Sequence, residues 1–133
     1  MSVDGEVLGR IGTGLVVLLG VGADDAEEQA TKLAEKIARL RVFDDDQGRM
    51  GRSLVEVGGA ALCVSQFTLY GDTRRGLRPS FTDAAEPERA ERLYEEFCAR
   101  LRAAEVPVET GRFGARMAVA LENEGPVTLL LEA

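Results

Sequence analysis

Residues 14–23 read GLVVLLGVGA and form the longest apolar stretch of the chain. This stretch is far shorter than the roughly 20 apolar residues that a membrane-spanning helix needs. Branched apolar residues bounded by glycines are typical of a buried strand. We therefore expect a central strand here. Because no basic stretch precedes it as in a secretory signal, we expect a cytoplasmic protein without a membrane partner.

The sequence pattern changes on both sides of this strand. Short apolar runs and a glycine within residues 3–8 predict a hairpin that leads into it. After it, Asp25 and Glu28 have the spacing of a capping box, and apolar residues at helical spacing predict a helix to about Arg41. A second helix should start at Pro87, since proline suits a first helical turn and an apolar stripe follows.

The rest of the chain predicts further strands. The stretches that favour them are 54–57, 60–67, 108–110, 117–121 and 127–131. With the hairpin and central strand this gives six or seven strands and two helices. Because strands come in runs between the helices, we expect an α+β fold of mostly antiparallel sheets packed with two helices. At 133 residues without a linker signal, we expect one domain, 1–133.

Composition excludes several kinds of chemistry. The chain contains no histidine, so the usual general base and the Ser-His-Asp and Cys-His arrangements are absent. Cys63 and Cys98 lack metal-ligand spacing, and we expect both to be reduced core residues. The acidic run 44–48 lacks the further ligands of a calcium loop and is interpreted as a solvated turn. We expect no metal and no cofactor.

The formal net charge of −7 argues against tight, non-specific binding of nucleic acid, which depends on many Lys and Arg side chains that neutralise phosphates. We expect no DNA partner. Any nucleic acid would have to be held locally, and the glycine-rich loop 69–80 offers three arginines for this, Arg74, Arg75 and Arg78. Plain solvation of these side chains is the alternative.

Two polar segments are candidates for a site. Residues 65–69 follow a buried strand, where Ser65 and Thr68 either line a pocket or only satisfy nearby backbone groups. Residues 123–128 lie between two expected strands, and a Gly-Pro pair in such a place commonly just turns the chain. Neither segment alone identifies a function.

Taken in order, four strings resemble the motif series of the D-aminoacyl-tRNA deacylases. They are SQFTL at 65–69, RPSF at 78–81, TGRFGA at 110–115 and NEGPVT at 123–128. The likeness also covers the N-terminal hairpin region and both helices. It implies the β-β-α sandwich of that family and a homodimer. It also implies hydrolysis of the ester bond of D-aminoacyl-tRNA, and of mischarged glycyl-tRNA(Ala), as a proofreading step in translation quality control.

The resemblance also assigns roles to residues. Gly125 and Pro126 would form a cis Gly-Pro step that projects into the pocket of the partner subunit and rejects L-aminoacyl groups. Backbone N–H groups near Phe67 and Thr68 would hold the developing oxyanion. Ser65 and Gln66 would line the substrate pocket, and Phe113 and Met117 would pack on the terminal adenosine or else be ordinary core residues.

The role of Thr68 leaves two alternatives. It either positions the substrate or water, or acts as a nucleophile, although no base is evident beside it in the sequence. The resemblance favours help from the 2′-hydroxyl of the terminal ribose in activating the attacking water. On that reading no protein nucleophile is required.

The sequence departs from the family at its N-terminus, and also at Gly51, where the family commonly has asparagine. Members of the family usually begin with a further N-terminal strand before the segment that matches 2–5, and that strand carries an arginine that supports the Gly-Pro loop. We expect this strand to be missing here, either because the start codon is placed downstream of the natural one or because this variant lacks it. The alternatives to an enzyme are a catalytically inactive tRNA-end-binding module and a structural oligomerisation domain.

Overall fold

A computed structural model describes all residues, 1–133, and the predicted apolar strand lies in its central sheet. Strand β3 (Gly14–Leu19) pairs with β6 (Ala60–Ser65), which pairs with β7 (Val108–Thr110). Both pairings are parallel. The three strands therefore end at the same edge of the sheet, which decides where the segments that follow them lie.

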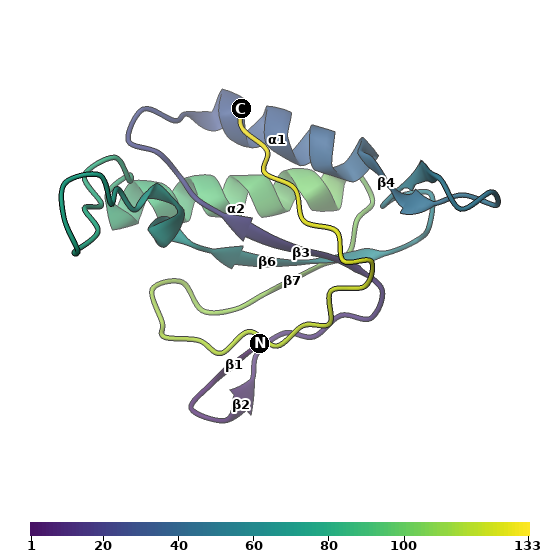
Figure 1. Cartoon of the computed structure of the whole chain (residues 1–133), viewed down its shortest axis with the longest axis horizontal. Helices are drawn as coiled ribbons and strands as arrows, with labels where there is room; N and C mark the ends of the chain where they lie inside the picture. The colour runs from purple at the N-terminus through teal and green to yellow at the C-terminus, as the bar shows by residue number, and fades with distance from the viewer.

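Two helices cover one face of this sheet (Figure 1). They are α1 (Glu27–Arg39) and α2 (Pro87–Ala103), which pack against each other. Parallel neighbours need long crossover connections, and the two helices lie in these connections. The main core fills the space between them and the sheet, with Phe97 and Leu101 of α2 fully buried. Cys63 and Cys98 are free thiols in this core, as expected.

Four further strands form two antiparallel ladders. β1 (Ser2–Val3) and β2 (Glu6–Val7) form the predicted hairpin, turned by Asp4 and Gly5 with φ of 50° and 83°. β4 (Arg41–Asp44) pairs with β5 (Met50–Ser53). A short 3₁₀ turn, η1 (Phe67–Tyr70), follows β6. No helix combines the length and apolar character needed to cross a membrane.

The α+β class and both helices are confirmed, but some local predictions are wrong. The central sheet is parallel, which alternation of apolar residues does not reveal. Helix α1 is capped by the Gln29 side chain, which accepts from the Ala26 N–H at 2.8 Å, rather than by Asp25 and Glu28. Residues 54–57 form a turn after β5 instead of a strand.

The predicted strands 117–121 and 127–131 are also absent. Ala118 makes one isolated bridge to Ser2, and residues 119–133 form no backbone–backbone hydrogen bond. Because a strand is defined by its ladder, this C-terminal segment remains extended without being part of a sheet. β3 is likewise unpaired along its outer edge, since β6 is its only neighbour.

Candidate functional site

The carboxyl ends of the three parallel strands bring several predicted site residues to one edge of the sheet. β3 leads into Gly20–Gly22, β6 into Gln66 and η1, and β7 into residues 111–117. Figure 1 shows the last two segments toward the same end of the molecule. Ligands of parallel sheets bind outside the carboxyl ends of the strands. This edge is therefore the candidate site.

The η1 turn presents Phe67 and Thr68 to solvent. The Gln66 N–H donates to the Leu19 carbonyl at 2.8 Å, which ties the start of the turn to the end of β3. Phe67 is 55% exposed, and its ring meets that of Phe81 edge-on at 5.0 Å. The backbone N–H groups of Phe67 and Thr68 donate to no group of the chain. Two adjacent donors are therefore free to bind an oxygen of a ligand.

Thr68 has a neighbour that bears on its role. The Gln66 side-chain amide donates to the Thr68 hydroxyl oxygen. An amide does not take up a proton, so this contact orients the hydroxyl without activating it. The arrangement favours a positioning role for Thr68 over a nucleophilic one.

Phe113 and Met117 lie in the segment after β7 and are both half-buried. The ring of Phe113 lies 6.3 Å from that of Tyr94, beside the main core. Met117 packs against the smaller apolar cluster of Met1, Leu62 and Val64. Both side chains therefore have core contacts, and contact with an adenosine base stays a prediction.

The arginine-rich loop is closed at its base by two backbone hydrogen bonds between Asp72 and Ser80, at 2.7 and 2.9 Å. The Arg74 guanidinium donates twice to the Asp72 carboxylate, at 2.9 and 2.8 Å, and these bonds lower the pKa of Asp72 to about 2. Arg75 and Arg78 are exposed and have no acidic partner. Two of the three arginines are thus free to bind an anion.

Residues 123–127 form an exposed loop around a cis Gly125–Pro126 peptide bond. Asn123 spans the loop: its Oδ1 accepts from the Val127 N–H and its Nδ2 donates to the Thr128 hydroxyl, both at 2.9 Å. Gly125 has φ +130°, and a Cβ there would lie 2.8 Å from Val127 Cγ2. Sequence reasoning did not single out Asn123, although asparagine near a Gly-Pro turn is a signal for such a contact.

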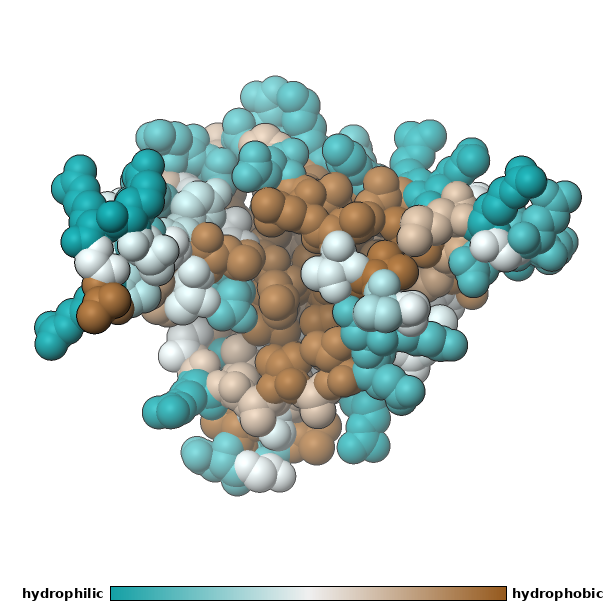
Figure 2. Space-filling model, viewed as in Figure 1, coloured by the Kyte–Doolittle hydropathy of each residue, from teal (hydrophilic) through white to brown (hydrophobic).

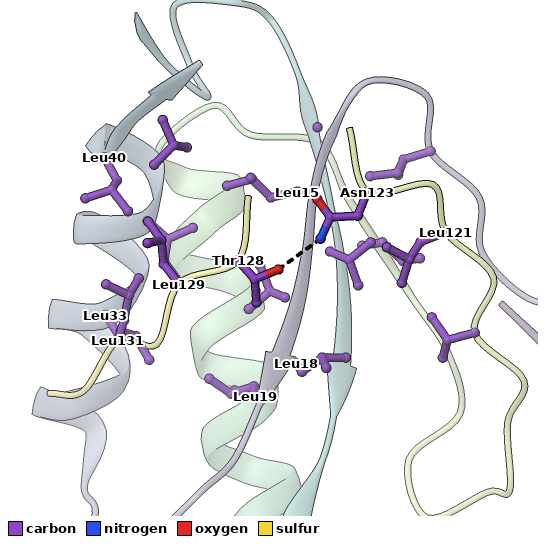
Figure 3. A pocket seen from close by; sticks show the side chains of 18 of the residues that line it. Leu15, Leu18, Leu19, Leu33, Leu40, Leu121, Asn123, Thr128, Leu129 and Leu131 are labelled. Carbon is purple, nitrogen blue, oxygen red and sulfur yellow. Dashed lines mark hydrogen bonds between the residues drawn. The ribbon is translucent and has the colours of Figure 1, made fainter. Parts of the chain in front are cut away.

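A wide apolar cleft of about 2090 Å³ separates the outer edge of β3 from the C-terminal segment. Figure 2 shows it as a band of apolar side chains across one face. In Figure 3, leucines of β3, α1 and the C-terminal segment line it, and the Asn123–Thr128 bond lies beside Leu15. Leu69 and Tyr70 also contribute to its lining, whereas Phe67 and Thr68 do not.

The two groups of predicted site residues do not meet within one chain. Figure 1 shows η1 (teal) at one end of the molecule and the stretch around residue 125 (yellow) toward the opposite end of the sheet. The free N–H groups of Phe67 and Thr68 thus lie apart from the Gly125–Pro126 loop of the same molecule.

Comparisons with known proteins agree over nearly the whole chain. D-aminoacyl-tRNA deacylases of Symbiobacterium thermophilum and Thermus aquaticus are each 59% identical over 133 residues, which covers all of this chain and 88% of each relative. A structure described as the c-Myc DNA unwinding element binding protein matches with a TM-score of 0.91 and 39% identity, over 99% of this chain and 90% of that one.

A second structure shares the fold at lower identity. It is described as a probable eukaryotic D-amino acid tRNA deacylase and matches with a TM-score of 0.75 and 20% identity, over 92% of this chain and 87% of that one. The family model described as D-Tyr-tRNA(Tyr) deacylase matches residues 1–132. With a match of this extent and relatives of this identity, the chain belongs to the D-Tyr-tRNA(Tyr) deacylase family.

Proposed function

We propose that this protein hydrolyses the ester bond between a D-amino acid and the terminal ribose of tRNA, and that it also clears mischarged glycyl-tRNA(Ala). The family match over residues 1–132 carries the proposal, and relatives named as deacylases favour an enzyme over an inactive tRNA-end-binding module. Chiral proofreading of this kind belongs where tRNA is charged, so we place the activity in the cytoplasm.

The proposed reaction needs no protein nucleophile. A water molecule adds to the ester carbonyl carbon, and the carbonyl oxygen becomes an oxyanion that accepts from the Phe67 and Thr68 N–H groups. The bond to the ribose oxygen then breaks, that oxygen takes one proton of the water, and the D-amino acid leaves as its carboxylate after the second proton has gone to solvent. The chain has no histidine to serve as the usual general base, and in this proposal the ribose 2′-hydroxyl assists the water.

Selectivity in this proposal comes from a second subunit. The Gly125–Pro126 loop of one chain enters the pocket around η1 of its partner, where loop carbonyls bind the α-amino group and leave no room for an L side chain. The opposite placement of the two segments in a single chain supports this arrangement (Figure 1). Ser65 and Gln66 line the pocket, with Phe113 and Met117 beside the terminal adenosine.

The arginine-rich loop 69–80 binds the tRNA in this proposal. Arg75 and Arg78 are exposed without acidic partners, and Arg74 exchanges Asp72 for phosphate on binding. Contacts to the backbone of the acceptor end position the substrate without reading its sequence. A local cluster of this kind suits a protein whose net charge is −7.

A substitution at the first residue of η1 tests the oxyanion contact. Proline is tolerated at a first helical position, and Phe67→Pro removes one N–H donor together with the ring. Phe67→Ala is the matched control, because it removes the ring and keeps the donor. In single-turnover hydrolysis of D-Tyr-tRNA we expect Phe67→Pro to lose about 100-fold or more relative to Phe67→Ala. Equal rates would exclude this donor from the reaction.

Mixed dimers test the shared site. Phe67→Pro disables the pocket, and Gly125→Val disables the loop, since a side chain at φ +130° is strained and would meet Val127. After unfolding and refolding of an equal mixture, half of the dimers hold both variants, and one of their two sites is intact. We expect about a quarter of the wild-type activity. No recovery of activity in the mixed dimers would show that each site lies within one chain. Separately, a wild-type protein that binds tRNA without turnover would favour the inactive module.

A further inference from the structure

The η1 turn has only one residue that reaches into the fold. Phe67, Thr68 and Leu69 are exposed, whereas Tyr70 is half-buried. Besides the Tyr70 side chain, the turn is held by the hydrogen bond from Gln66 N–H to the Leu19 carbonyl, by bonds within the turn itself and by the edge-on contact of Phe67 with Phe81 on its outer side. Tyr70 is thus its main side-chain anchor on the inner side.

Tyr70 lies directly against two glycines that follow β3. A Cβ on Gly20 would lie 3.1 Å from Tyr70 Cε2, and a Cβ on Gly22 would lie 2.8 Å from Tyr70 Oη and 3.0 Å from Cζ. Neither glycine has a positive φ, so the backbone does not require glycine at either position. The close approach of the Tyr70 ring does require it.

Asp25 lies at the same position, beside Gly22 and the Tyr70 ring. Its Oδ2 accepts from the Gly22 N–H at 2.7 Å and would lie 3.2 Å from the same added Cβ, so the carboxylate and the phenol face one small space. Burial, followed by the charge of Asp25, raises the pKa of Tyr70, which stays protonated at neutral pH. The segment after β3 therefore holds Tyr70 through shape, with the Asp25 carboxylate close to its hydroxyl group.

We propose that Tyr70 is a positioning residue for deacylation: seated on Gly20 and Gly22, it fixes the η1 turn so that the Phe67 and Thr68 N–H groups point at the developing oxyanion. This inference rests on the proposed function. It assigns to Gly20 and Gly22 the role of making room for the anchor, and it connects the end of β3 with the chemistry at the end of β6.

The test introduces a steric clash with Tyr70 by Gly22→Ala and then relieves its closest contact by Tyr70→Phe. Gly22→Ala places a methyl group against the Tyr70 hydroxyl, and we expect kcat for D-Tyr-tRNA to fall about 10- to 100-fold with KM nearly unchanged, because displaced donors lose alignment with the transition state. The double variant Gly22→Ala with Tyr70→Phe lacks the oxygen that makes the closest contact, at 2.8 Å, and should recover part of this loss, because Cζ at 3.0 Å remains. Tyr70→Phe alone keeps the ring, and its kcat is the reference against which the double variant is compared.

Gly12→Ala is the matched control, because nothing lies within 4 Å of an added Cβ there and its φ is not positive. If Gly22→Ala does not fold, Tyr70→Leu is measured instead, with the same fall in kcat expected. Wild-type kcat in Gly22→Ala or Tyr70→Leu, or a double variant no better than Gly22→Ala, would overturn the positioning role. A wild-type protein that releases no D-tyrosine would instead overturn the proposed function itself.

Discussion

Replacing Asn123 by alanine removes both hydrogen bonds that span the Gly125–Pro126 loop. Each is 2.9 Å long and solvent-exposed, so each contributes at the low end of the usual range, about 0.5 kcal/mol. Together they favour the ordered loop by about 1 kcal/mol, a factor of about five. The disordered fraction of the loop should therefore rise about fivefold in Asn123→Ala.

The consequence differs for the two substrate enantiomers. If the loop is ordered in nearly all wild-type molecules, a rise of about fivefold in the disordered fraction still leaves most molecules with an ordered loop. Hydrolysis of D-Tyr-tRNA should therefore change little. Leakage into L-Tyr-tRNA should rise about fivefold, because the disordered loop no longer excludes the L side chain. The assay is the ratio of kcat/KM for D- and L-Tyr-tRNA, measured on variants whose unfolding transitions match the wild type.

Thr128 provides a graded control for the same loop. Thr128→Val removes only the bond from Asn123 Nδ2, so leakage should rise about twofold, whereas Thr128→Ser keeps the hydroxyl and should behave as wild type. An unchanged D-to-L ratio in Asn123→Ala would refute the reasoning. A larger effect from Thr128→Val than from Asn123→Ala would refute it as well.

Three further predictions concern charge, packing and the open edge. Asp72→Asn frees Arg74 and should tighten tRNA binding about two- to fivefold at low salt, with the gain lost at high salt. In the wild type the Asp72 pKa is lowered to about 2, so the Asp72–Arg74 ion pair is fully formed above the usual carboxyl pKa of 3.8. The pair is lost as the pH falls toward 2. Leu101→Ala, at a fully buried site, should lower the free energy of unfolding in urea by about 2–5 kcal/mol. Leu18 is an exposed residue of β3, whose outer edge is unpaired, and Leu18→Lys places a charge there that opposes association of chains through this edge. Concentration-dependent light scattering should therefore fall. Unchanged scattering would show that this edge does not drive association.

Local patterns predicted the helices well because each helix buries a stripe that its own spacing creates. Pro87 begins α2, and the stripe from Ala90 to Leu101 is its buried face. The hairpin followed from short apolar runs around a glycine, and in the structure Asp4 and Gly5 supply the positive φ of its tight turn. Such signals involve residues close in sequence, so no tertiary information is needed to interpret them.

Strand pairing was predicted less well. The apolar runs 117–121 and 127–131 carry the composition of strands, but a strand needs a partner for its N–H and C=O groups, and residues 119–133 have none in this chain. Likewise, nothing in the run 14–20 indicates whether its neighbour lies parallel or antiparallel. Direction and partner are set by which elements meet in space.

The sequence by itself determined the class of fold, the motif series at 65–69 and 123–128, and the lack of histidine chemistry, because these depend on residue identity and short spacing. Only the tertiary structure decided that the ends of β3, β6 and β7 share one edge, that Tyr70 is seated on Gly20 and Gly22, and that the Gly125–Pro126 loop lies away from η1. These relations join residues that are about 45 or more positions apart in the sequence. Such contacts follow from the packing of parallel strands under two helices, which no local pattern encodes.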